Sequence, residues 1–339
     1  MATNIGLYTG TTGSLLITLL QNSYQGAKDC VNPSLLLEHI WQNIQSENLL
    51  SFDCGIPGIG WALEWCNQNQ LLDINSDEVL SDIDDFLYRK TVYGSIQQLP
   101  LMDLIGVSNY FYIRALSLNK GQSRYRHICH RECLLLVLED IDAKYKIEID
   151  KNKRLNRGEY FQFLSVYLLL LYRLLVLNIP SIKQDFSRVL CESIEVTLDF
   201  CNKRLTPEID KSLLYYTALL YGVLLIVSKK HKIIIDEHNA QYQQLYILGN
   251  VIKQKILPKI TSKIDLIVLL ALYQISTHDS QTDSDLQGLI TEISCNHSFD
   301  SLPDTFSGGK GILEVIRFWL YFKQRKDITD FLLLHASIT

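Results

Sequence analysis

Residues 53–65 read DCGIPGIGWALEW, and two further stretches place glycines in the same way ahead of an apolar segment. These stretches are 6-GLYTGTTGSLL and 306-FSGGKGILEVIRFW. In each of the three, two glycines stand three residues apart where a helix is predicted to begin. Glycine has no Cβ atom, so such positions allow backbones to approach closely and leave helix N–H groups accessible. For any one stretch alone, a tight turn with close helix packing is the simpler interpretation.

The same kind of start recurs along the chain at intervals of about fifty residues. Apolar segments begin near Gly6, Gly55, Ile105, Gly158, Leu213, Lys263 and Gly308. Amphipathic segments lie between them, at residues 33–48, 77–91, 124–145, 182–204, 237–256 and 284–295. A repeat of this length in a helical chain is typical of stacked helix pairs.

The segment 77–91 shows the pattern of the amphipathic helices. One helical face is apolar and consists of Val79, Ile83, Phe86 and Leu87. The other faces carry acids, namely Asp77, Glu78, Asp82, Asp84 and Asp85. Such a helix forms an outer wall, whereas a helix that is apolar all round must be surrounded by others.

We therefore predict an all-α fold in which apolar helices lie inside and amphipathic helices outside. The predicted architecture is an α/α toroid, a seven-fold double helical barrel with about seven inner and six outer helices, in a single domain over residues 1–339. The alternative is an open superhelix. Its inner helices would need a wet concave face, and segments 213–228 and 264–275 offer none.

Composition excludes several classes of protein. The net charge of −5 provides no positive surface for nucleic acid. The first twenty residues contain no Lys or Arg, so they lack the charged region of a secretion signal. The eight cysteines form no CxxC pair and are best interpreted as free thiols of a cytoplasmic protein. The apolar runs Leu164–Leu177 and Ser212–Ser228 are shorter than the roughly 20 residues that span a bilayer, so no membrane span is predicted.

Taken together, the three glycine motifs resemble those of the lanthionine synthetase C-like family, peptide cyclases built as an α/α toroid. The stretch 102-MDLIGVSNYFY is similar to that family's Asp-Leu-Ile-x-Gly-x-x-Gly motif, and 330-DFLLL is similar to its short C-terminal segment. The resemblance covers nearly the whole chain. It implies a zinc ion held by two Cys and one His, which binds a substrate Cys as a thiolate for addition to a dehydroamino acid.

The metal ligands that the resemblance implies are absent from the matching positions. Tyr216 stands where the first Cys ligand is expected, and 262-SKIDLIVLLALYQIS contains neither Cys nor His of the expected pair. Phe161 stands at the position of a further family His. Asp103 matches the family's acid position and is the one candidate catalytic residue, but a single Asp does not hold zinc. We therefore expect no metal and no other cofactor.

The expected function is that of a zinc-free, lanthionine synthetase C-like pseudoenzyme in the maturation of ribosomally made peptides. Its partners would be a precursor peptide or a peptide-modifying enzyme. The predicted binding residues are Tyr8, Asp53, Cys54, Asn156, Glu159, Tyr215, Tyr216, Asp265 and Lys310, together with Asp103. Tyrosines and carboxylates suit the recognition of peptide amides and cationic side chains.

Two alternatives stay open, so the sequence does not decide whether the protein is an enzyme. One is an active cyclase with zinc at a rebuilt site, or with Cys54 as a reactive thiol at a helix N-terminus. A metal at 127-HICHREC is a weak possibility, because buried thiols and a solvated histidine explain that stretch more simply. The other alternative is an α/α-toroid glycosidase that uses Asp53 with Asp103 or Glu159 as its carboxylate pair.

Overall fold

The computed structural model describes residues 4–25, 32–45, 47–117, 124–150, 157–203, 211–230, 247–260, 262–277, 280–295, 310–321 and 331. Every regular element in these ranges is a helix, and none is a strand. The predicted all-α class is therefore confirmed. The chain divides into two compact units, unit 1 with residues 1–153 and 302–323, and unit 2 with residues 154–301 and 324–339. The closed ring and the single domain stay predictions.

Each predicted apolar segment contains a helix that begins within about five residues of its predicted start. These helices are α1 (Thr11–Gln25), α3 (Ile56–Gln68), α6 (Leu101–Ala115), α8 (Arg157–Leu174), α10 (Lys211–Lys230), α12 (Lys263–Thr277) and α14 (Lys310–Tyr321). The largest difference is at α1, because residues 7–10 form a turn ahead of the helix. The period of about fifty residues is thus a period of helices.

The amphipathic segments are helical as well. They form α2 (Pro33–Ile44), α4 (Ser76–Val79), α5 (Ser81–Val92), α7 (Arg124–Asp150), α9 (Pro180–Lys203) and α13 (Ser280–Cys295). The predicted helix 77–91 is broken at Leu80 into α4 and α5. Of the segment 237–256, the structure describes residues 247–251, which are helical, and the helical turns η2 (Ile252–Ile256) and η3 (Leu257–Lys259) that follow.

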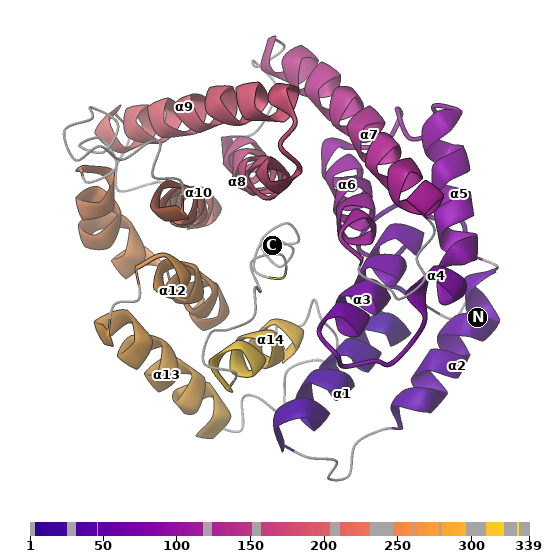
Figure 1. Cartoon of the computed structure of the whole chain (residues 1–339). Coiled ribbons are helices and arrows are strands. Elements are labelled where there is room, and N and C mark those ends of the chain that lie inside the picture. Colours follow the sequence, from indigo (N-terminus) through magenta and orange to yellow (C-terminus); the bar gives the residue numbers. More distant parts are fainter. Residues whose placement is uncertain are drawn as a thin grey trace. The chain divides into compact units, whose positions relative to one another are not determined.

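In unit 1, α3 packs against both α1 and α6, and α14 packs against α1 (Figure 1). The amphipathic helices cover this row, with α2 on α1, α7 on α6, and α5 against α3 and α7. The Tyr24 hydroxyl of α1 donates a hydrogen bond to Glu314 of α14. The first and last apolar helices of the chain are therefore neighbours within one unit.

In unit 2, α10 lies between α8 and α12. The amphipathic α9 packs on α8 and α10, and α13 packs on α12 (Figure 1). Residues 214–224 of α10 are all buried. The expectation that this helix has no wet face is confirmed.

The first two glycine motifs bring backbones into direct contact. A Cβ atom on Gly58 would lie 1.8 Å from the carbonyl oxygen of Phe52, and one on Gly6 would lie 2.5 Å from the Cα atom of Cys54. Real Cβ atoms do not approach other atoms so closely, so any larger residue there forces the backbone apart. The close approach of backbones predicted for the glycine motifs is confirmed for the first two, whereas Gly308 of the third lies outside the described residues.

One helix among the described residues, Gly158–Leu177, is long and apolar enough to cross a membrane. The run Leu164–Leu177 is part of a longer helix, because α8 begins at Arg157 and the turn η1 (Leu175–Leu177) extends it. The prediction that this segment is too short was therefore wrong. In the most apolar part of this helix, 61% is buried inside the protein. Core helices of soluble proteins can be equally long and apolar, so the helix is weak evidence for a membrane span.

Candidate functional site

Four predicted site residues come together in unit 1, in the segments before α1 and α3 and in the first turn of α6. The Tyr8 N–H donates to the Asp53 carbonyl oxygen at 2.9 Å, and the Phe52 N–H donates to Asp103 Oδ1 at 3.4 Å. Asp53 Oδ1 accepts a hydrogen bond from the Cys54 N–H at 2.8 Å. Tyr8 is buried, Asp53 is exposed, and Cys54 and Asp103 are half-buried. The first two glycine motifs and the matched acid thus meet at one place.

The pKa shifts in this cluster favour Asp103 over Cys54 as a reactive group. Burial raises the pKa of the Asp103 carboxyl, the hydrogen bond from Phe52 opposes the shift, and the charge of Asp53 adds to it. A carboxyl with a raised pKa is suited to hold and donate a proton. Burial also raises the pKa of the Cys54 thiol, and the hydrogen bond with Ser51 only partly opposes this. The Cys54 thiol is therefore protonated near neutral pH, which argues against its use as a nucleophile.

Four other predicted site residues lie in unit 2. Tyr215 and Tyr216 are buried near the start of α10, with ring centroids 5.4 Å apart. Asp265 is half-buried in the first turn of α12, and burial raises the pKa of its carboxyl. Glu159 is exposed in the first turn of α8. Both α8 and α12 pack against α10, so these residues stand on neighbouring helices.

Two predicted site residues are described only in part or not at all. Asn156 lies outside the described residues. Lys310 is the first residue of α14, and the structure describes its backbone but not its side chain. Their predicted roles therefore stay predictions.

The interpretation of 127-HICHREC needs a correction. Cys133 is buried and Cys129 is half-buried, as expected for thiols that face a neighbouring helix. However, His130 is only 4% exposed, whereas His127 is the solvated histidine of this stretch. His130 is buried because α7 packs against α6, and the stretch lies in the first turns of α7.

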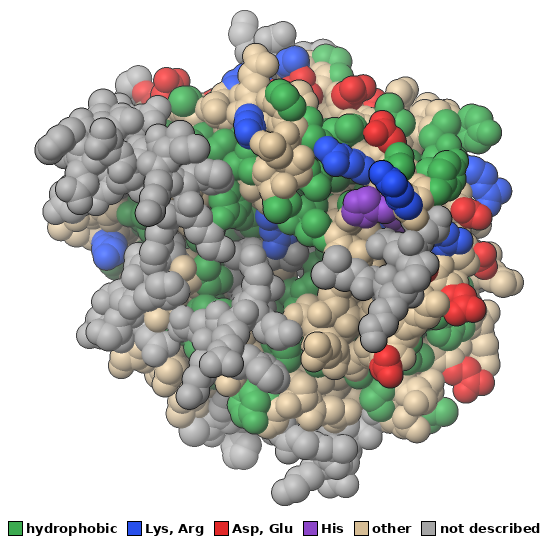
Figure 2. Space-filling view, viewed as in Figure 1, with side chains coloured by type: hydrophobic (Ala, Val, Ile, Leu, Met, Phe, Trp, Pro, Cys, Tyr) green, Lys and Arg blue, Asp and Glu red, His purple; other side chains and the backbone are tan. Residues whose placement is uncertain are grey.

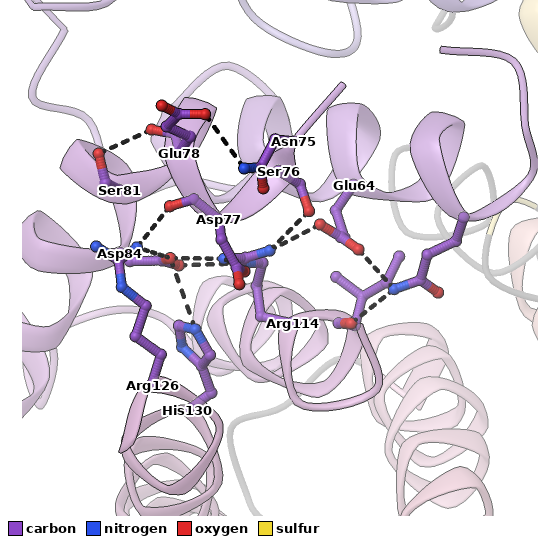
Figure 3. A network of polar contacts seen from close by, with 12 residues as sticks. Glu64, Asn75, Ser76, Asp77, Glu78, Ser81, Asp84, Arg114, Arg126 and His130 are labelled. Carbon is purple, nitrogen blue, oxygen red and sulfur yellow. Dashed lines mark hydrogen bonds and ion pairs between the residues drawn. The ribbon is translucent and has the colours of Figure 1, made fainter. Parts of the chain in front are cut away.

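A second cluster, which the sequence did not predict, surrounds Arg114 near the end of α6 (Figure 3). The guanidinium donates two hydrogen bonds to Asp84, at 2.8 and 3.1 Å. It donates three more, to Glu64 at 2.8 Å and to Ser76 and Asp77 at 3.1 Å each. All five N–H donors of the arginine are thereby used. The side chains of Arg114 and Glu64 are fully buried.

Helix α7 extends this cluster toward the surface. Asp84 Oδ1 also accepts a hydrogen bond from the Tyr110 hydroxyl at 2.5 Å. Arg126 Nη1 donates to the Asp77 carbonyl oxygen at 2.6 Å and lies 3.7 Å from Asp84 Oδ2. His130 Nε2 lies 3.6 Å from the same Asp84 oxygen. Burial lowers the pKa of His130 to about 4 although Asp84 opposes the shift, so the imidazole is neutral at physiological pH.

The pattern of the amphipathic helix placed Asp84 on a solvated face, and this was wrong. Asp84 is buried because Arg114 and Tyr110 satisfy its oxygens. One sequence signal could have found this arrangement. Glu64 is the one charged residue of α3, and Arg114 is the one charged residue of α6 beyond its first turn. They are 50 residues apart, which matches the repeat period, so adjacent repeats place them opposite one another.

Within the described part of the chain, no group of three or more His, Cys, Asp or Glu side chains is arranged to hold a metal ion. The expectation of a zinc-free protein stays a prediction.

Comparisons of the chain with models of protein families, with curated proteins and with solved structures gave no match.

Proposed function

We propose that the protein is a zinc-free, lanthionine synthetase C-like protein that binds a precursor peptide or a peptide-modifying enzyme in the cytoplasm. The observation that carries the proposal is the meeting of the glycine-motif segments in unit 1. The segment before α1 hydrogen-bonds to the segment before α3 through Tyr8 and Asp53, and Asp103 of α6 hydrogen-bonds to Phe52. Three consecutive apolar helices therefore present their N-terminal ends, with two carboxylates, at one place.

The closed α/α toroid of seven inner and six outer helices is part of this proposal. It is supported by the contact of α14 with α1, the last and first apolar helices of the chain. Neighbouring terminal repeats are what a closed ring of helix pairs requires, whereas in an open superhelix the terminal repeats lie at opposite ends.

Two buried rings support the zinc-free part of the proposal. Tyr216 and Phe161 stand where the resemblance implies a Cys ligand and a His, and both side chains are buried. A phenyl ring has no atom that binds zinc, and a neutral phenol is a poor substitute for a thiolate. Tyrosines and carboxylates in place of the metal suit the binding of peptide amides and cationic side chains.

The test combines metal analysis with a ring-closure assay. Protein purified without a metal-binding tag should contain clearly less than one zinc per chain. A peptide with dehydroalanine and a free Cys should bind to it, yet alkylation and mass spectrometry should detect as many free thiols as in a control without protein. Zinc near one per chain, together with ring closure that is lost in Asp103→Asn, would establish an active cyclase instead.

A glycosidase is the second candidate, and one observation favours it. The charge of Asp53 contributes to the raised pKa of Asp103, so the two carboxylates interact electrostatically, and glycosidases use a carboxyl with a raised pKa together with a second carboxylate. Release of sugar from an oligosaccharide panel, abolished in Asp103→Asn and Asp53→Asn, would replace the peptide-binding proposal.

A further inference from the structure

A pocket of about 360 Å³ lies between α5 and the first turns of α7 in unit 1. The rings of Tyr88, Phe111 and Tyr125 line it, and Asp84 and His130 contribute polar groups to its wall. Phe111 is fully buried, whereas Tyr125 is largely exposed and marks the mouth. A mostly apolar pocket with a few placed polar groups is typical of a site for a small ligand or a single side chain.

Two polar groups of this wall are left open. His130 is 4% exposed, and its Nε2 is buried without a hydrogen-bond partner among the described residues. Within the same ranges, Asp84 Oδ2 accepts one hydrogen bond, from Arg114 Nη2 at 2.8 Å. Arg126 Nη1 lies 3.7 Å from Oδ2, beyond hydrogen-bond distance. A carboxylate oxygen accepts about two hydrogen bonds, so one lone pair of Oδ2 stays open.

The two open groups face each other without satisfying each other. Figure 3 shows the imidazole of His130 pointing toward Asp84, and Nε2 lies 3.6 Å from Oδ2, which is too long for a hydrogen bond. Two lone pairs facing each other repel, so the proton of the neutral imidazole is placed on Nε2, toward the carboxylate. The wall therefore holds an open N–H beside an open acceptor, and buried polar groups without partners cost free energy.

A hydroxyl group satisfies both with one atom. Its oxygen accepts the hydrogen bond from Nε2, and its own proton goes to Oδ2. An oxygen about 2.8 Å from each atom fits the separation of 3.6 Å between them. A carbonyl or carboxylate only accepts and would face the charged Asp84, while an ammonium only donates and would leave the Nε2 proton unpaired. The ligand must therefore bring a hydroxyl.

The charges around the pocket favour a neutral ligand. The lining contains carboxylates at Asp84 and Asp85 and a guanidinium at Arg126. The nearby surface is basic, since Figure 2 shows Lys and Arg side chains beside a histidine on the face over α7, and Arg124 is exposed at the start of this helix. Charges of opposite sign oppose each other, and water and salt screen the exposed ones. Neither a cation nor an anion is therefore clearly favoured.

We propose that this pocket binds a phenol, as presented by a tyrosine side chain or by a free phenolic compound. The phenol hydroxyl accepts from His130 Nε2 and donates to Asp84 Oδ2, and it is neutral at physiological pH. The ligand ring packs among Tyr88, Phe111 and Tyr125, because aromatic rings attract one another in edge-to-face and offset contacts. An aliphatic alcohol lacks these ring contacts. Neither the metal content of the protein nor a role in peptide maturation enters this inference.

Calorimetric titration of the full-length protein tests the ligand chemistry with three probes. They are N-acetyl-tyrosine methylamide, its phenylalanine counterpart and p-cresol. The tyrosine probe should bind, and the phenylalanine probe should bind roughly ten- to hundredfold more weakly, because it leaves both wall groups unpaired. p-Cresol should also bind. Tighter binding of the tyrosine probe assigns the site to a polypeptide, and tighter binding of p-cresol assigns it to a free phenol.

Matched variants locate the binding. His130→Leu should weaken the tyrosine probe at least tenfold and bring its affinity close to that of the phenylalanine probe. His127→Leu, at an exposed histidine one turn earlier on α7, should preserve the difference between the probes. Tyr88→Ala should weaken both probes about three- to tenfold, because it removes a ring from the wall. Tyr93→Ala, at a tyrosine that is 79% exposed, is its control and should leave both affinities unchanged.

Equal affinity of the wild type for the tyrosine and phenylalanine probes overturns the proposal, because the hydroxyl is then not recognised. No binding of the tyrosine probe or p-cresol at millimolar concentration overturns it as well, since water alone then satisfies the two wall groups. An undiminished difference between the probes in His130→Leu has the same meaning. If His130→Leu does not fold, as judged by its circular dichroism melting curve, Tyr88→Ala and Tyr93→Ala decide, and equal affinities in the two variants place the binding outside this pocket.

Discussion

Helix α6 in unit 1 and helix α10 in unit 2 are both apolar and buried among their neighbours, yet different interactions hold them. Helix α6 ends in Arg114, which bonds to three carboxylates and a hydroxyl. Along α10, residues 214–224 are buried without a charged side chain, and a hydrogen bond from the Tyr273 hydroxyl to the Ala218 carbonyl oxygen joins it to α12. Directional bonds therefore set the position of α6, whereas close packing sets that of α10.

The largest expected effect on stability is at the buried cluster around Arg114. Arg114→Ala leaves Glu64 and Asp84 buried without their counter-ion, so the free energy of unfolding should fall by about 4–5 kcal/mol, the upper end for a broken buried ion pair. Urea denaturation measures the loss. Arg89→Ala, at an exposed arginine of α5, is the control and should change stability by less than about 0.5 kcal/mol. If Arg114→Ala lost as little stability as Arg89→Ala, the buried network would add little to the stability of unit 1.

The matching test for the apolar packing of α10 is Tyr216→Ala. The side chain is 7% exposed, so truncation leaves a cavity and should cost about 3–4 kcal/mol. Thermal melting and a peptide or partner pull-down decide between packing and recognition. A nearly unchanged melting temperature with binding weakened by about 1–3 kcal/mol would show that the ring serves recognition and not the core. Tyr93→Ala, at a tyrosine that is 79% exposed, controls for the loss of any aromatic ring.

Low pH should reduce the free energy of unfolding through the polar cluster around Arg114, which includes His130, and not through the apolar packing of α10. The pKa of His130 is lowered from 6.5 to about 4 by burial, with Asp84 and Asp77 opposing and Arg114 and Arg126 assisting the shift. The unfolded chain takes up a proton at His130 below about pH 6.5, and the folded protein does so only near pH 4. The free energy of unfolding therefore falls as the pH drops through this window, by up to about 3 kcal/mol.

This contribution is isolated by comparing the wild type with His130→Leu. Between pH 7 and pH 4.5 the wild type should lose about 2–3 kcal/mol more than the variant in urea denaturation, since all other titrating groups are common to both. His127→Leu should behave as the wild type. Parallel losses in all three proteins would show that the imidazole of His130 is not held neutral by the fold.

The smallest effects are expected from a pair of helix glycines. A Cβ on Gly60 of α3 would lie 2.5 Å from the ring of Tyr110, which its bond to Asp84 holds in place, so Gly60→Ala should destabilise by about 1–3 kcal/mol. A Cβ on Gly222 of α10 would lie 3.1 Å from the ring of Tyr273. That contact relaxes with a small shift, and alanine favours the helix by about 1 kcal/mol, so Gly222→Ala should be close to neutral. An equal drop in melting temperature in Gly60→Ala and Gly222→Ala would contradict the contrast between the polar cluster around Arg114 and the apolar packing of α10.

Much of the secondary structure follows from local patterns. The period of about fifty residues located the apolar helices, and the apolar stripe of residues 77–91 predicted a helix that the structure breaks only at Leu80. Part of the candidate site was predictable for the same reason. The glycine motifs stand before Thr11 and Ile56, so their segments were expected at helix starts, and the structure brings Tyr8, Asp53, Cys54 and Asp103 together there.

The sequence by itself determined the all-α class, the places of the helices and the burial of α10, because hydrophobic periodicity and glycine spacing act over one or two helical turns. Only the tertiary structure decided that Asp84 and His130 are buried, and that Arg114 meets carboxylates from α3, α4 and α5. Periodicity assigns a charged residue to water by default. Whether a charge is instead buried depends on a partner far along the chain, and packing alone brings the two together.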